Sequence, residues 1–178
     1  MADVFYSVCP FGTGNLLSGG SPTIEVDSSG NAVVTLNGAS LVDNIGQGVA
    51  VEYNSEKYFI SEITDLTHFK LVDALGVTAP QQANTALTSV HHEYASIAAA
   101  LGDSSIQPGV TDADHLNSGD LVTLDVDLNI ACYYDHVDYT PDNGGQIWTE
   151  TGIYTTGLYT NRIRIYTPTG GKQSIINQ

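Results

Sequence analysis

The chain has 178 residues, of which 42% are hydrophobic and 14% are charged, so it can bury a core and is not a disordered chain. Its 20 acidic and five basic residues give a net charge of −15, which argues against nucleic acid and anionic membranes as partners. That charge suits a basic protein partner, divalent cations or simple solubility. No apolar stretch reaches the ~18 residues of a membrane-spanning helix, and no signal peptide is visible.

Short strands are expected through the first half of the chain. Residues 4–9 are β-prone, and residues 23–27 and 32–36 flank a turn, so that they form a hairpin. Alternating apolar residues at 48–73 predict a meander of further short strands. This spacing is typical of small barrels and sandwiches.

One α-helix is predicted at about residues 89–101. The apolar residues between Val90 and Leu101 fall on one helical face. His91 and His92 would lie in its first turn, as ordinary surface or half-buried side chains, because adjacent residues on a helix point in different directions.

The strongest strand pattern follows at residues 122–134, where apolar residues occupy every second position. Asp125 and Asp127 are among the polar residues that alternate with them. The strand is therefore expected to bury one face and expose the other. The last strands are expected at 147–154 and 162–166.

Two acidic pairs are candidates for calcium binding. Asp125 and Asp127 would share a strand face, about 7 Å apart by the rise per residue, a separation that also suits an acid/base pair. Asp112 and Asp114 lie in a loop, which can wrap a cation with carboxylates and backbone carbonyls. The glycine and glutamate that an EF-hand requires after Asp125 are absent from their positions. The alternative for both pairs is an ordinary solvated acidic surface.

Aromatic residues crowd the C-terminal third of the chain. Trp148, Tyr133, Tyr154 and Tyr159 could stack on sugar rings or anchor a protein interface. The alternative is that they pack in the core or across strands. The sequence shows no motif for nucleophilic catalysis, phosphate binding or zinc binding, so no enzyme activity is predicted.

The two cysteines are 123 positions apart, at Cys9 and Cys132. Cys132 lies within an alternating apolar series, so a buried free thiol is expected there. A disulfide that ties Cys9 to Cys132 is the alternative, and the sequence leaves this choice open.

Three runs in the C-terminal part stand out: Asp112–Val122, Leu128–Asp135 and Asn161–Pro168. Together they resemble the opening segment of right-handed parallel β-helix proteins from environmental bacteria and phages. The resemblance is partial, lies mainly within residues 112–168, and supplies no catalytic residue. Such proteins usually continue into many more coils. The resemblance implies a surface, extracellular or virion setting for this chain.

We therefore expect a mainly β fold. It would be a sandwich or barrel-like domain of short strands, or a truncated β-helix head segment, with one α-helix near residues 89–101. Residues 1–178 would form a single domain, with a possible subdivision into a β meander at 1–86, a helix plus β-helix-like segment at 87–168, and a tail at 169–178.

The expected function is that of a non-enzymatic structural or assembly protein, such as a decoration or tail component on a phage virion. Its partners would be protein neighbours and copies of itself, with no nucleic acid and no membrane. No cofactor is expected apart from the calcium considered above. A carbohydrate-binding or polysaccharide-degrading module is the alternative function.

Overall fold

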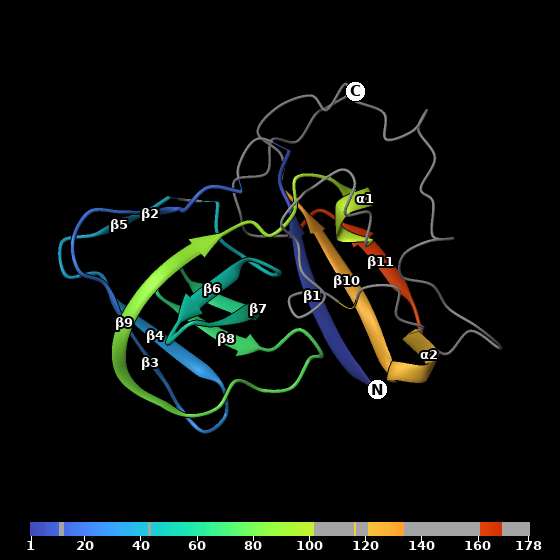
Figure 1. Ribbon diagram of the computed structural model, residues 1–178, viewed down its shortest axis with the longest axis horizontal. Coiled ribbons are helices and arrows are strands. Elements are labelled where there is room, and N and C mark those ends of the chain that lie inside the picture. The colour runs from blue at the N-terminus through green and yellow to red at the C-terminus, as the bar shows by residue number, and fades with distance from the viewer. Residues whose placement is uncertain (11–12, 43, 102–115, 117–120, 134–160, 169–178) are drawn as a thin grey trace.

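The structure, a computed structural model, describes residues 1–10, 13–42, 44–101, 116, 121–133 and 161–168. Figure 1 shows how they are arranged. The prediction of a mainly β chain is confirmed. In chain order the elements are β1 (Ala2–Val8), β2 (Leu17–Ser18), β3 (Thr23–Val26), β4 (Asn31–Thr35), β5 (Ser40–Leu41), β6 (Ala50–Tyr53), β7 (Glu56–Asp65), β8 (His68–Val72), β9 (Gln82–His91), α1 (Ile97–Ala100), α2 (Leu121–Leu124), β10 (Val126–Cys132) and β11 (Ile163–Tyr166).

A closed antiparallel barrel forms the first half of the molecule, with the strand order β3-β4-β8-β7-β6-β9. Local turn chemistry builds the β3–β4 hairpin, because the Asp27 carboxylate accepts hydrogen bonds from the backbone N–H groups of Ser29 and Asn31. Alternate residues of each strand fill the barrel, among them Ile24, Val34, Val51, Ile60, Leu71 and Val90. The barrel has no open edge for another strand to join.

A parallel sheet with the order β1-β10-β11 stands beside the barrel (Figure 1). Its register aligns Val4 with Leu128 and Leu128 with Ile163, so that apolar side chains stack in columns across the sheet. Tyr94, which precedes α1, and Leu101, which follows it, pack in the same apolar core as Val4 and Leu128 of this sheet. The short two-stranded sheet β2-β5 is paired with neither of them, and its Leu17 and Leu41 pack against the barrel core.

The barrel and the sheet share an apolar contact. Phe59, on the outer face of the barrel, packs edge-on against Tyr6 of β1, with ring centroids 5.1 Å apart. The backbone approaches closely here, because a side chain at Gly48 would collide with the backbone of Tyr6. Gly48 also has a φ of +79°, a conformation that glycine adopts without strain.

The predicted helix at 89–101 is wrong over most of its length. β9 extends to His91, and only Ile97–Ala100 is helical. The apolar spacing suited a helix, but β9 hydrogen-bonds to β3 on one side and to β6 on the other, which closes the barrel. These tertiary pairings outweigh local helix propensity.

The predicted strand at 122–134 is shorter than expected and is not exposed on one face. Residues Leu121–Leu124 form α2, and Asp125 follows with a φ of +56°, so β10 begins only at Val126. Both faces of β10 are covered: Leu128 and Ile130 pack in an apolar core, and Arg164 contacts Asp127 and Asn129 on the other face. The expected strand at 162–166 is found as β11, and the one at 147–154 lies outside the described residues.

The subdivision suggested at residues 86 and 87 stays a prediction, and the described elements on its two sides are connected. β9 runs across that point, and β1, from the start of the chain, pairs with β10. The described residues show a barrel and three parallel strands, and they do not show a parallel β-helix. Among them, no helix is long and apolar enough to cross a membrane. The tail expected at 169–178 lies outside the residues that the structure describes.

Candidate functional site

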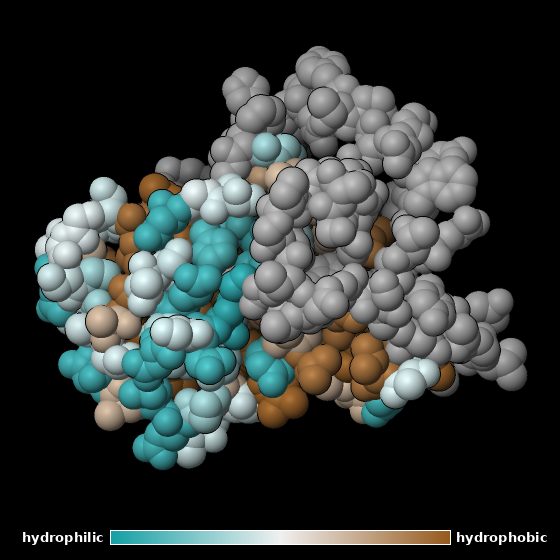
Figure 2. Space-filling view, in the orientation of Figure 1, coloured by the Kyte–Doolittle hydropathy of each residue, from teal (hydrophilic) through white to brown (hydrophobic). Residues whose placement is uncertain are grey.

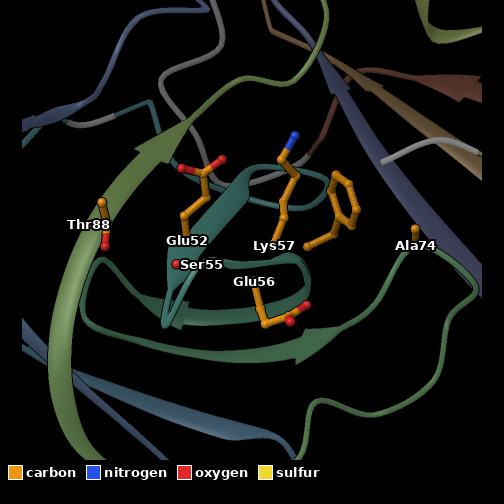
Figure 3. Close-up of a pocket in the computed structure, with 7 residues that line it drawn as sticks. Glu52, Ser55, Glu56, Lys57, Ala74 and Thr88 are labelled. Atoms are coloured by element: carbon orange, nitrogen blue, oxygen red, sulfur yellow. The ribbon is translucent and has the colours of Figure 1, made fainter. Parts of the chain in front are cut away.

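A pocket of about 430 Å³ opens on the outer face of the barrel beside the β6–β7 hairpin (Figure 3). Hydroxyl and charged groups line most of it, and Phe59 and Ala74 supply an apolar part. Its lining residues are Glu52, Ser55, Glu56, Lys57, Phe59, Ala74 and Thr88.

The hairpin turn sets the geometry of this pocket. Asn54 and Ser55 both have positive φ, at 52° and 64°, as a two-residue turn that matches the strand twist requires. The Asn54 side chain fixes the turn to β9, because its Nδ2 donates to Gln82 Oε1 at 2.8 Å and its Oδ1 accepts from Thr85 Oγ1 at 3.0 Å. Glu52 and Lys57 therefore face each other across the hairpin.

A line of polar contacts runs from the pocket wall into the interior. Lys57 Nζ donates to Glu93 Oε1 at 2.9 Å, and His91 Nε2 lies 3.3 Å from Glu93 Oε2. Ser89 Oγ lies 3.0 Å from His91 Nδ1. Glu93 is buried, and its backbone N–H donates to Ser7 Oγ of β1. The ion pair thus connects the barrel to the parallel sheet.

This line of contacts was not predicted from the sequence, although the alternation of its residues is visible there. Ser89, His91 and Glu93 alternate, so they share one side of an extended segment. A hydroxyl, an imidazole and a carboxylate in series are the elements of a nucleophilic site. Here, however, Ser89 is not among the pocket-lining residues, and the carboxylate already binds Lys57. These contacts connect the three side chains to Lys57 of β7 and, through the Glu93 backbone, to Ser7 of β1.

The two calcium candidates on the predicted strand lie in different environments. Asp125 precedes β10 and is exposed, with its Oδ2 2.8 Å from the N-terminal amine. Asp127 is buried and binds Arg164 Nη2 at 2.6 Å. The expected shared, solvated face is wrong for this pair, because Asp125 stands outside the strand and β11 covers Asp127. Asp112 and Asp114 lie outside the described residues.

Asp127 belongs to a polar cluster on one face of the sheet. Its Oδ1 accepts from the backbone N–H of Arg162, and the Asn129 side chain donates to Asp3. Arg164 also reaches Asp3 and Asn129, at 3.4 and 3.2 Å. This cluster joins all three strands. Within the ranges that the structure describes, no group of three or more potential ligands is placed to hold a metal ion.

Tyr133 is the only aromatic candidate that falls in the described ranges. Its side chain is buried, its hydroxyl donates to the Gln47 carbonyl at 2.9 Å, and its ring centroid is 4.5 Å from that of His92. Burial raises the pKa of Tyr133. It packs in the core and does not offer a surface for a sugar. Trp148, Tyr154 and Tyr159 lie beyond the described residues.

No disulfide joins Cys9 to Cys132. Cys9 packs in the barrel core with Tyr133, whereas Cys132 packs with the apolar column on the opposite face of the parallel sheet. Their side chains therefore point away from each other, although β1 and β10 are paired. Burial raises the pKa of the Cys132 thiol to about 11, so it is not a reactive nucleophile at neutral pH.

One end of the molecule exposes an apolar surface that the sequence did not reveal. We call it the apolar end patch, and its residues are between 36% and 60% exposed: Leu75, Val77, Val122 and Leu124. Figure 2 shows hydrophobic residues gathered near the N-terminal end of β1.

Two contacts bring these residues to the same end of β1. Gly76, between Leu75 and Val77, lies against Ala2 and Asp3. The Ala2 N–H donates to the carbonyl of Asp125, directly after α2, at 2.9 Å. The loop after β8 and the helix α2 therefore lie at the same end of β1.

Comparison of the chain with protein-family models, with curated proteins and with solved structures gives no match.

Proposed function

We propose that this chain is a non-enzymatic assembly protein that binds protein neighbours and copies of itself through the apolar end patch. The observation that supports this proposal most directly is the apolar end patch. Large apolar side chains that gather on one surface, rimmed by polar residues, are typical of interaction sites. Leu75 and Val122 come from segments far apart in the sequence, yet they share this end of the molecule.

The charge of the chain supports this assignment. A protein with a net charge of −15 repels nucleic acid and anionic lipid, and this charge is compatible with protein surfaces as its partners. Association at an apolar patch would remove these side chains from water, and that gain can outweigh repulsion between surface charges screened by salt.

We assign this assembly role to a virion surface, as a decoration or tail component. The parallel stacking of β1, β10 and β11 supports this setting, because aligned columns of residues in parallel strands are what a β-helix head segment requires. The resemblance noted for residues 112–168 implies the same setting.

Sedimentation velocity over a range of protein concentrations tests the assembly role. We expect the wild type to associate, and Leu75→Asp and Val122→Asp each to weaken that association. Val42→Asp is the matched control, because Val42 is as exposed as Leu75, at 49%, and is not part of the patch. A wild type that remains monomeric at all concentrations and binds no virion component would contradict the proposal.

A carbohydrate-binding module is the second candidate, and the pocket at the β6–β7 hairpin is the observation that favours it. Carboxylates, hydroxyls and an ammonium beside an apolar wall can hydrogen-bond the hydroxyls of a sugar ring. Glycan-array binding that is lost in Glu52→Ala would support this function. Glu52 is suitable because its substitution spares the buried Lys57–Glu93 pair.

A further inference from the structure

The outer edge of β11 carries backbone groups that face away from the sheet. β11 lies at one end of the order β1-β10-β11, so none of the described strands pairs with its outer side. The Leu128 N–H donates to the Arg162 carbonyl at 2.8 Å, and Leu128 is aligned with Ile163. In a parallel pair, alternate residues direct their backbone groups to the same neighbour. Ile163 and Ile165 therefore direct theirs outward.

The side-chain columns of the sheet are also incomplete at this edge. One column runs from Tyr6 through Ile130 to Ile165. Its first two members are fully buried, whereas Ile165 is 40% exposed. A further aliphatic residue beside Ile165 would continue the column and cover it.

The aligned strands indicate which sequence fits beside β11. β1 and β10 place an aspartate, Asp3 or Asp127, at the same level, followed by aliphatic or aromatic residues at alternate positions. Arg162, directly before β11, stands at this level, and its side chain is exposed. Arginine beside aspartate already recurs in the sheet, since Arg164 binds Asp127 at 2.6 Å.

We propose that the outer edge of β11 is a strand-addition site. It would bind an extended segment of another polypeptide that runs parallel to β11. That segment would carry an acidic residue level with Arg162 and aliphatic residues level with Ile163 and Ile165. Backbone hydrogen bonds would supply affinity, and the alternating side chains would supply specificity. The inference deepens the proposed function, on which it rests, by naming a class of partner segment.

A labelled synthetic peptide with the sequence of residues 123–131 is the probe, because it contains the strand that β11 accepts on its inner side. The control peptide exchanges the residues copied from Asp127 and Leu128, which keeps the composition and breaks the alternation. Fluorescence anisotropy measures binding to the whole chain. We expect the first peptide to bind at least about tenfold more tightly than the control.

Two variants test the geometry. Ile165→Pro removes an N–H that points outward, so the β10–β11 ladder stays intact while peptide binding is lost. Arg162→Glu should weaken binding by about tenfold, and a peptide with lysine in place of the residue copied from Asp127 should recover it. A melting temperature near that of the wild type checks that each variant is folded.

Equal binding of both peptides, or binding that both variants leave unchanged, would overturn the proposal. Its failure is separable from failure of the assembly role. If sedimentation shows association that depends on Leu75 while no peptide binds, only the strand-addition site is wrong. If the peptide binds and the chain shows no association through the apolar end patch, the assembly role assigned to that patch is wrong.

Discussion

Acidification should destabilise the fold through one histidine in the core. His92 is 1% exposed, and neither of its ring nitrogens makes a hydrogen bond with acceptable geometry to the described residues. Its ring packs against Tyr133. Burial, reinforced by the nearby His91, lowers the pKa of His92 from 6.5 to about 4, and the backbone of Asn44 opposes this only in part.

The direction of this pH effect on stability follows from the linkage between protonation and folding. Between pH 6.5 and 4 the unfolded chain takes up a proton on His92 that the folded protein excludes. The stability that neutral His92 contributes is fully present above its unfolded pKa of 6.5. It is lost as the pH falls toward its folded pKa of about 4. Because one pKa unit corresponds to about 1.4 kcal/mol, the loss reaches about 2.5 kcal/mol near pH 4.5. That is a large part of a typical domain stability of roughly 5–15 kcal/mol.

Urea unfolding at neutral pH and near pH 4.5 measures this effect. We expect His92→Leu to retain more of its neutral-pH stability than the wild type does. The exposed carboxylate of Asp65, whose pKa is lowered to about 2 chiefly by its hydrogen bond with His68, acts in a more acidic range and does not obscure the result. An equal loss in the wild type and in His92→Leu would refute the reasoning.

Two further changes test how the barrel is fastened to the sheet. Lys57→Met should lower the free energy of unfolding by about 3 kcal/mol, because Glu93 would stay buried without its ammonium partner. Lys70→Met, which breaks an exposed pair with Glu62, should change that free energy by less than about 1 kcal/mol in the same denaturant titration. Gly48→Ala should lower the melting temperature by several degrees, since its side chain would meet backbone atoms at a positive φ; a melting curve like that of the wild type would contradict the close approach.

The sequence predicted well the elements that depend on neighbouring residues. The β3–β4 hairpin follows from the turn residues after Asp27, and the meander β6–β8 follows from alternation and from the turn at Asn54. The helix was predicted wrongly because the apolar residues from Val90 to Leu101 fit a helical period as well. Pairing of β9 with two distant strands decided the outcome, and such pairing cannot be read from a local window.

The candidate site was less predictable because its partners come from distant parts of the chain. Asp127 was expected on a solvated face, but it is buried and forms an ion pair with Arg164 of β11. Glu93, which follows β9, is paired in the interior with Lys57 of β7, and β7 is not a neighbour of β9 in the barrel. The apolar end patch likewise depends on a loop and a short helix that only the fold places at the same end of β1.

Hydrogen exchange of the chain at low and at high protein concentration tests the assembly role most directly. If the chain associates through the apolar end patch, amides at residues 74–77 and 121–124 should exchange more slowly at high concentration, while those of the pocket hairpin at 53–57 should not change. Exchange that is independent of concentration at residues 74–77 and 121–124 would contradict the account.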